Sequence, residues 1–283
     1  FLKGAIGPNK LSRLLCKAGF EPVNLINGAV VYEGSDFELA SPIPLNWVRS
    51  WYSDSQYVGW LGHGVHCVYD RAVELYPEED ALGLRMDDGR VVAFPMLLPE
   101  EEFYLRQEKI TLKRTQEGYT AYEHKSKLLY DFSLFNGKKY QLTKISNPDG
   151  LCIVFEFTAN RLKRIIDAAG REIKVSTKEG FIQKLELVGP EEDELLIAYE
   201  YDQDGNMSAI IDALQKATVI TYENHLMVEK TDRNGQTFYW EYDTKNRCTH
   251  TWGDGGWQEG WLEYHPEEGY NLVTDANRAV TTY

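Results

Sequence analysis

The chain has 283 residues, of which 43% are hydrophobic, and its 44 acidic side chains against 30 basic ones give a net charge of −14. This composition is typical of a folded globular protein, and the charge disfavours binding to a nucleic-acid backbone. The longest apolar runs are far too short to span a bilayer, so no membrane contact is expected from this segment. The 18 Tyr, 11 Phe and 7 Trp favour β structure.

The first predicted element is a short helix over residues 9–19. Asn9 is a typical helix cap, three leucines share one face of the helix, and Gly19 suits the left-handed conformation that ends many helices. We therefore expect a helical N-terminal segment over residues 1–20.

From Glu21 onward the helical periodicity disappears, and short runs of alternating apolar and polar residues take its place. Residue pairs that favour tight turns separate these runs. The pairs are Asn27-Gly28, Asp88-Gly89, Asn136-Gly137, Asp149-Gly150, Asp204-Gly205 and Asn234-Gly235. The pattern predicts an almost all-β chain.

The second half of the chain carries an internal repeat. Strands end on aromatic residues at Tyr201, Tyr222, Tyr242 and Tyr264, in steps of 21, 20 and 22 residues. Aspartates run in antiphase at Asp212, Asp232, Asp254 and Asp275, in steps of 20, 22 and 21 residues. Each period therefore holds two strands and two turns, which make one hairpin unit.

The repeat has a physical reason. Residues two apart in a strand share a face, so stacked hairpins align their aromatic residues and bury one continuous sheet face. A single hairpin buries too little surface to be stable, so each unit needs neighbours. Asp202 and Asp243 directly follow a repeat tyrosine, and we expect them to hold turns by accepting hydrogen bonds from backbone amides.

These repeats resemble the tyrosine–aspartate (YD) repeats of the Rhs family of bacterial polymorphic toxins. The matching stretches are Tyr201-Asp-Gln-Asp-Gly-Asn-Met207 with Ile211-Asp212, Tyr242-Asp-Thr-Lys-Asn-Arg247, Thr251–Gly256, Val273–Asp275 and Thr281–Tyr283. Upstream, Glu21–Gly28, Asp36–Leu39, Pro42–Leu45, Arg49–Ser53 and Gly59–Gly62 resemble the module that opens Rhs shells. The repeats depart from the family pattern where Glu223 follows Tyr222 and His265 follows Tyr264.

The resemblance implies an all-β fold in which a YD-repeat β-hairpin ribbon forms part of a hollow Rhs cocoon, with one short N-terminal helix, as in the related Tc-toxin shells. It divides the chain into the segment 1–20, an N-terminal β module over 21–140 and YD repeats over 141–283. The chain starts at Phe1 and stops at Tyr283 within a repeat, so we expect it to be the first arc of a shell. The helix at Lys10–Ala18 is then a candidate plug for one end of the shell.

The resemblance also implies a non-catalytic role: the segment helps to encapsulate a C-terminal toxin domain for delivery by a type VI secretion system, in interbacterial competition. The expected partners are the rest of the Rhs polypeptide, the enclosed toxin, a VgrG-type spike, a PAAR domain and a chaperone. The expected location is the bacterial cytoplasm before export and a target cell afterwards. On this interpretation the repeat residues are structural, and no catalytic residue, cofactor or metal ligand is expected.

Two other functions remain open. YD repeats also occur in cell-wall proteins, so the chain is alternatively a surface adhesin or a carbohydrate-binding protein, with Trp252, Trp257 and Trp261 stacking on sugars. The simpler interpretation is that these tryptophans belong to the core or to the aligned aromatic residues of the repeats. A glycosidase would need two paired carboxylates, and the acidic clusters after Pro77, Pro99, Pro190 and Pro266 fit exposed turns better.

A metal site has two weak candidates. His63, His66, Cys67 and Asp70 are metal-ligand types, but a strand would point His63 and His66 to opposite faces. Asp202–Asn206 resembles a calcium loop without its later ligands, so a hairpin turn explains it better. The cysteines at 16, 67, 152 and 248 form no C-x-x-C pair and are interpreted as packed, reduced thiols.

Overall fold

The computed structural model describes residues 23–283, so the helix expected over residues 9–19 and its segment 1–20 lie outside the described residues. Residues 23–283 form strands β1 to β26 and two short 3₁₀ turns, which confirms the prediction of an almost all-β chain. In all six predicted turn pairs the glycine has a positive φ, from 74° at Gly28 to 96° at Gly137. Within the same residues, no helix has the length and apolar character needed to cross a membrane.

The elements before residue 151 are β1 (Val31–Leu39), β2 (Leu45–Tyr52), β3 (Val58–Gly59), β4 (Gly62–His63), β5 (Val65–Cys67), β6 (Ala72–Tyr76), η1 (Pro77–Glu79), β7 (Ala81–Arg85), β8 (Val91–Pro95), β9 (Glu102–Leu105), β10 (Ile110–Arg114), β11 (Tyr119–Glu123), β12 (Leu128–Phe135) and β13 (Lys139–Ser146). The later elements are β14 (Cys152–Thr158), β15 (Arg161–Ile166), β16 (Glu172–Lys178), β17 (Phe181–Leu187), β18 (Glu194–Tyr201), β19 (Met207–Asp212), β20 (Ala217–Glu223), β21 (Leu226–Thr231), β22 (Thr237–Tyr242), β23 (Cys248–Gly253), η2 (Asp254–Gly256), β24 (Trp257–His265), β25 (Tyr270–Thr274) and β26 (Val280–Thr282).

The chain divides into two compact units. The first holds Ser35–Arg49 and His66–Ile197, and the described part of the second holds residues 23–34, 50–65 and 198–283. Each unit therefore combines a piece of the N-terminal module with a stretch of repeats. The boundary at residue 141 remains a prediction from the sequence.

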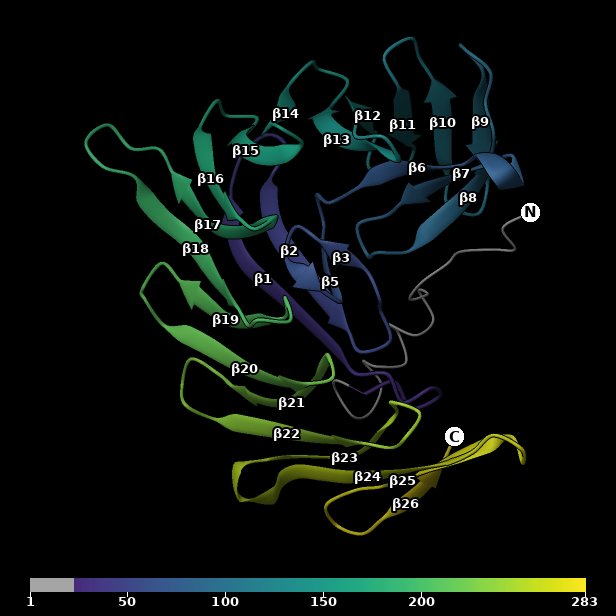
Figure 1. The fold of residues 1–283 in the computed structure, drawn as a ribbon, viewed down its shortest axis with the longest axis vertical. Helices are drawn as coiled ribbons and strands as arrows, with labels where there is room; N and C mark the ends of the chain where they lie inside the picture. The colour runs from purple at the N-terminus through teal and green to yellow at the C-terminus, as the bar shows by residue number, and fades with distance from the viewer. Residues whose placement is uncertain (1–22) are drawn as a thin grey trace. The chain divides into compact units, whose positions relative to one another are not determined.

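In the first unit, neighbouring strands from β9 to β13 and from β14 to β17 pair antiparallel in chain order (Figure 1). Strand β6 pairs with β7 and also with β13, where Val73 faces Tyr140. The side chains of Leu45, Trp47, Leu112 and Phe132 are completely buried. Apolar residues at alternate strand positions thus build the core of this unit.

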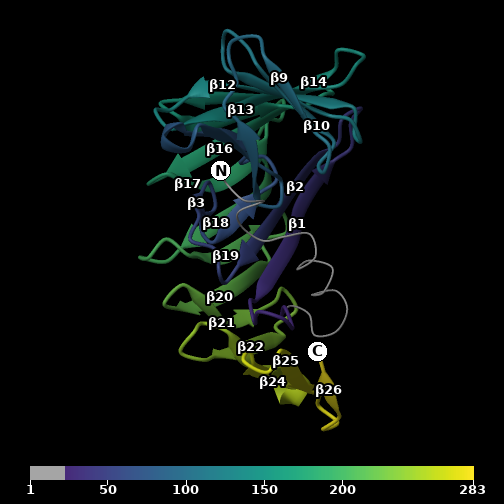
Figure 2. The ribbon, with the colours of Figure 1, turned by 90° about the vertical axis from the view of Figure 1, so that its right-hand side faces the viewer.

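In the second unit, strands β19 to β26 lie side by side in chain order, and Figures 1 and 2 show the same sequence of hairpins. One face of these strands is buried through Ile220, Trp240, Leu262 and Val273. The repeat of 20 to 22 residues is therefore a repeat of hairpins, and this antiparallel ribbon is the predicted repeat architecture.

A β-bulge recurs within the hairpins of both units. The register shifts between Glu156 and Phe157, between Ser176 and Thr177, between Thr221 and Tyr222, and between Glu241 and Tyr242. Each bulge lies just before the end of a strand, and in three of the four the residue after the shift is aromatic: Phe157, Tyr222 or Tyr242. Since a bulge increases the local twist, the ribbon twists at regular intervals, and the sequence alone did not show this.

Candidate functional site

The aspartates of the repeat hold turns in one recurring geometry. The Oδ1 atom of Asp202 accepts hydrogen bonds from the backbone amides of Asp204, at 3.0 Å, and Asn206, at 2.9 Å. The same two bonds, from the residues two and four positions later, occur at Asp212, Asp232, Asp243 and Asp275. Each carboxylate thus supplies the hydrogen-bond acceptor that these amides of the turn would otherwise lack.

Local interactions lower the pKa of two of these carboxylates, Asp212 and Asp243. The Arg233 guanidinium donates to Asp212 at 2.8 Å and, with backbone amides of the turn, holds the pKa of Asp212 below its usual value. Desolvation by burial raises the pKa of Asp243, but hydrogen bonds from Arg247 and Lys245 outweigh it, and the net pKa is lowered. An ionised carboxylate is the stronger acceptor for the turn amides.

Two further turns share this geometry and were missed in the sequence. The Oδ1 atoms of Asn147 and Asp167 each accept hydrogen bonds from the amides two and four residues later. Their spacing of 20 residues matches the repeat and was a signal available in the sequence. Asp254 fits the spacing but differs in geometry, since it lies in η2 and its Oδ2 accepts from the Thr237 amide at 2.8 Å.

The repeat tyrosines bond back to the preceding strand. The hydroxyl of Tyr222 donates to the carbonyl of Met207 at 3.3 Å, and that of Tyr242 to Met227 at 2.8 Å. The Tyr264 hydroxyl donates in the same way to Cys248. Each acceptor lies at the start of the strand before the tyrosine's own strand: Met207 and Cys248 are the first residues of β19 and β23, and Met227 is the second residue of β21. The tyrosines therefore tie neighbouring strands together at one edge of the ribbon.

Replacing Asp232 by alanine is expected to lower the free energy of unfolding by about 1–2 kcal/mol, because two turn amides lose their acceptor. Asp232→Asn should cost much less, since Asn147 naturally holds the equivalent turn through its amide oxygen. Urea unfolding of the three proteins measures the difference. Equal losses for the alanine and asparagine variants would contradict the hydrogen-bonding role.

Replacing Tyr242 by phenylalanine is expected to cost about 1 kcal/mol, the usual value of one hydrogen bond whose acceptor stays behind. The ring and its packing are kept, so only the bond to the Met227 carbonyl is lost. Amide exchange in β21 and β22 should rise relative to the wild type. The variant Tyr239→Phe is the control, because the Tyr239 hydroxyl lies 3.5 Å from the exposed Asp254 carboxylate.

A loop of the N-terminal module contacts the turn that follows Tyr242. The Gly28 carbonyl accepts a hydrogen bond from the Cys248 amide at 2.9 Å. The Asn271 side-chain amide donates to the carbonyls of Leu25 and Ile26, each at 2.9 Å. Residues 24–29 are thereby fixed against strands β23 and β25, more than 200 positions later in the chain.

A second loop contacts the turn that follows Tyr201. The His63 amide donates to the Gly205 carbonyl at 3.0 Å. A Cβ atom at Gly62 would lie 2.5 Å from the same carbonyl oxygen and 3.2 Å from the Tyr201 ring. Only glycine fits this close approach of two backbones.

The two contacted turns start at Asp202 and Asp243, which are 243 − 202 = 41 positions apart, or two repeats. Both directly follow a tyrosine, so both are the YD turns of the sequence. We call the loops 24–29 and 58–64, with the turns that they contact, the braced edge. It is the candidate functional site of the second unit, and its action is mechanical: it ties two loops near the start of the chain to two of the repeats.

The other candidate residues have ordinary contacts. His63 stacks on His225, whereas His66 and Cys67 are buried, and buried Asp70 lies 3.9 Å from the Lys139 ammonium. Within residues 23–283, no group of three or more His, Cys, Asp or Glu side chains is arranged to hold a metal ion. The Asp202 carboxylate of the calcium-like loop accepts hydrogen bonds from Asp204 and Asn206.

Three of the cysteines lie within the described residues. Cys67, Cys152 and Cys248 are free thiols, and Cys67 and Cys248 are buried. Burial raises the pKa of the Cys248 thiol to about 12. A thiol with so high a pKa stays protonated at neutral pH and is a poor nucleophile or metal ligand.

The tryptophans proposed for sugar binding contribute to a stack of rings across β22, β23 and β24. His250 lies between Trp252, at 4.2 Å, and Trp261, at 5.1 Å between ring centroids, and its nitrogens face Glu241 and Glu259. Trp252 also stacks on Tyr239, and the Arg278 guanidinium lies over Trp261. The faces of Trp252 and Trp261 are thus occupied by the chain itself, and half-exposed Trp257 contacts Phe238 edge-on.

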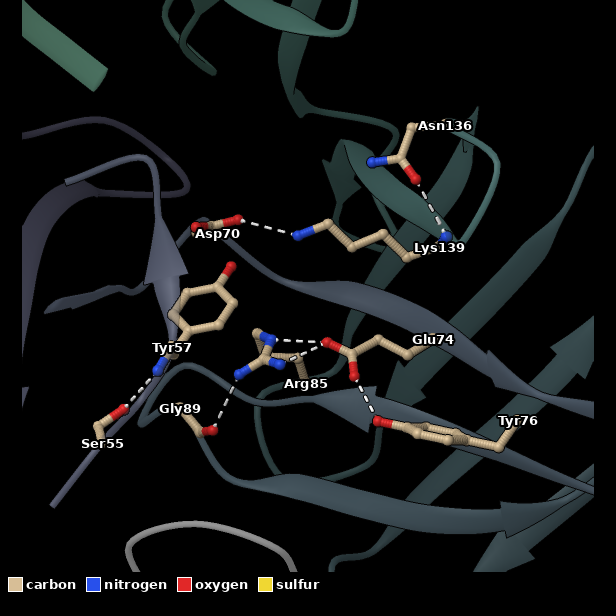
Figure 3. Close-up of polar contacts among 9 residues, drawn as sticks. All are labelled: Ser55, Tyr57, Asp70, Glu74, Tyr76, Arg85, Gly89, Asn136 and Lys139. Carbon is tan, nitrogen blue, oxygen red and sulfur yellow. Dashed lines mark hydrogen bonds and ion pairs between the residues drawn. The ribbon is translucent and has the colours of Figure 1, made fainter. Parts of the chain in front are cut away.

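A cluster of charges in the first unit has the composition of an acid–base site (Figure 3). The Glu74 carboxylate accepts hydrogen bonds from Arg85, at 2.9 Å from its Nε atom, and from the Tyr76 hydroxyl, at 2.6 Å. Burial and the bond to Glu74 raise the pKa of Tyr76. Arg85 also donates to the Gly89 carbonyl. The cluster joins strands β6 and β7, and its carboxylate is already neutralised by a guanidinium.

Comparisons with known proteins agree with the repeat. The model of a domain of unknown function, DUF6531, matches residues 20–94. "Probable deoxyribonuclease RhsA" of Dickeya dadantii is 22% identical over 257 residues, covering 87% of this chain and 18% of the relative. "Double-stranded DNA deaminase toxin A" of Burkholderia cenocepacia is 24% identical over 245 residues, covering 84% of this chain and 16% of the relative. The chain thus spans less than a fifth of the length of these relatives.

Among solved structures, the TcdB2–TccC3 complex matches 81% of this chain and 16% of its own chain, at 12% identity and a TM-score of 0.38. A score of this size does not by itself show a shared fold. The matched N-terminal domain, the similarity to Rhs proteins along most of the chain and the tyrosine–aspartate repeat together support the resemblance to Rhs-type YD-repeat proteins.

Proposed function

We propose that this chain is a structural segment of an Rhs shell that encloses a toxin domain encoded elsewhere in the same polypeptide. The observation that carries the proposal is the ribbon of hairpins, in which turns of one geometry recur between Asn147 and Asp275. Such a ribbon grows by adding hairpins, each stabilised by its neighbours. The relatives named as a deoxyribonuclease and a DNA deaminase toxin are several times longer than this chain, which leaves room for further repeats and a toxin.

In this proposal the repeat residues are structural parts of the wall. The aspartates hold the turns and the tyrosines tie adjacent strands at one edge. These residues are Tyr201, Asp202, Asp212, Tyr222, Asp232, Tyr242, Asp243, Tyr264 and Asp275. The module over 21–140 braces the wall formed by 141–283, and toxic activity belongs to a domain outside this chain.

Delivery by a type VI secretion system is part of the same proposal. The shell would form in the bacterial cytoplasm and be loaded with a VgrG-type spike, a PAAR domain and a chaperone before transfer to a competing cell. The relative named as a DNA deaminase toxin supports a toxin as cargo. Copurification of the full-length protein with a VgrG-type spike tests this step, and release of toxin from a strain that lacks the secretion system would contradict it.

Electron cryomicroscopy of the full-length protein tests the shell. We expect a closed wall in which the repeats follow one another, with additional density inside. A toxin domain within such a wall should also resist protease until the wall is unfolded. An open ribbon without an enclosed volume, or a toxin domain that is cleaved as fast as a free domain, would overturn the proposal.

A further inference from the structure

Two histidines from distant parts of the chain stack on each other at the braced edge. The rings of His63, in β4, and His225, in the turn between β20 and β21, have centroids 3.8 Å apart and an interplanar angle of 19°. The stack lies where hairpin β3–β4 contacts the turn Asp202–Asn206, next to the bond from the His63 amide to the Gly205 carbonyl. Two charged imidazoles at this distance would repel each other, so the stack weakens when both rings carry a charge.

The hydrogen bonds of His225 fix its tautomer. The Asn206 amide nitrogen donates to Asp202 Oδ2 at 2.8 Å, which turns the Asn206 oxygen toward His225 Nδ1, 2.7 Å away. His225 Nδ1 is therefore the donor and carries a hydrogen. A second proton, on Nε2, would make this ring a cation.

His63 is poorly placed to accept a proton. Its Nδ1 atom is buried and has no hydrogen-bond partner among the described residues. A protonated imidazole carries hydrogen on both nitrogens, so protonation would leave a buried N–H without an acceptor. The resulting cation would also lie against the ring of His225.

We propose that the His63–His225 stack is a pH-sensitive latch, which holds hairpin β3–β4 on the turn Asp202–Asn206 at neutral pH and releases it on acidification. Opening would detach one of the two loops that brace the ribbon. The second brace, at Gly28, contains no histidine between residues 24 and 29 and would stay in place.

The charged groups near the stack come from three segments of the chain. Hairpin β3–β4 has no charged residue besides His63, and the segment before it contributes Asp54. The contacted turn contributes Asp202 and Asp204, and strand β20 ends at Glu223. Negative charges attract a cation, but burial and the neighbouring His225 ring outweigh this attraction at His63, whose pKa is lowered.

The direction of the pH effect follows from His63. Burial first, and then the charge of His225, lower the pKa of His63 below its ordinary value of 6.5. Because the docked state disfavours the proton, docking is complete above the pKa of the open state and weakens as the pH falls through it. Each unit by which the docked pKa lies below the open value gives about a tenfold larger open population at low pH.

Amide hydrogen exchange of the 283-residue chain at about pH 7.5 and about pH 5.5, corrected for the intrinsic rate, tests the latch across the histidine range. For the His63 amide we expect a several-fold larger open population at the lower pH. His63→Phe keeps a stacked ring but cannot titrate, so it should abolish the change. His250→Gln, a histidine variant within the ring stack of the same unit, should leave the change intact.

A second variant and a direct titration keep the test decisive if His63→Phe does not fold. His225→Gln removes the neighbouring charge while keeping a donor for Asn206, and it should raise the pKa of His63 measured from its ring resonances. Three results would each overturn the proposal. They are equal protection of the His63 amide at both pH values, an unchanged response to pH in His63→Phe, and a wild-type His63 pKa at or above the ordinary value of about 6.5.

Discussion

Replacing Gly28 by alanine is expected to lower the free energy of unfolding by about 3–5 kcal/mol, from left-handed strain and overpacking together. Gly28 has a φ of +74°, and an added Cβ would lie 2.6 Å from both Arg247 Cβ and the Tyr264 hydroxyl oxygen. Neither neighbour is free to yield. The Tyr264 hydroxyl is bonded to the Cys248 carbonyl, and the Arg247 guanidinium lies over the Tyr264 ring while bonded to Asp243. The brace at residues 24–29 should therefore detach.

Gly235→Ala is the matched control. Gly235 has a φ of +84°, but nothing lies within 4 Å of the position that its Cβ would take. Alanine there should cost only the backbone strain, about 1–2 kcal/mol. Urea unfolding measures the global loss, and exchange of the Cys248 amide reports the brace directly. If both variants lost the same stability and the Cys248 amide stayed protected in Gly28→Ala, the contact would not brace the ribbon.

The repeat of the second half was predictable because its signals are local. A tyrosine every 20 to 22 residues and an aspartate in antiphase mark the ends of each hairpin, and the structure places turns and strands accordingly. The repeat also extends further upstream than its tyrosines do. Asn147 and Asp167 hold the same turn, but the neighbouring strand β14 ends beyond Phe157 rather than at a tyrosine. The turn needs only a side-chain oxygen, so the aromatic marker was too strict a criterion.

Other turns could not be predicted, because their residue types do not favour the backbone conformation that the turn requires. Ala159 and Glu179 adopt positive φ values of 50° and 55° in tight hairpin turns, although neither residue type favours this conformation. Strand pairing on both sides imposes it, so tertiary structure overrides local preference. The turn at Asn27-Gly28 was predictable, whereas its contact with Cys248 was not. A sequence does not state which of several equivalent repeats a distant loop will contact.

Replacing Arg49 by alanine is expected to cost about 3–5 kcal/mol, because it removes the guanidinium that pairs with a buried carboxylate. The Arg49 Nε atom donates to both oxygens of Asp36, at 3.1 and 3.0 Å, and the two side chains are only 3% and 4% exposed. The pair joins β1 to β2 within the first unit. Lys113→Ala is the control, because the pair of Lys113 and Glu100 is 40% and 57% exposed and should contribute about 0–1 kcal/mol.

The double variant Arg49→Met with Asp36→Leu separates the two explanations of such a loss. If the cost of Arg49→Ala comes from stranding a charge in the core, removing both charges should restore most of the stability, because apolar side chains of similar size tolerate the site. If the ion pair itself supplies the stability, the double variant should be at least as unstable as the single one. Urea unfolding of the three proteins decides between them. We expect the double variant to be the more stable, since the desolvation of two charges offsets most of their attraction.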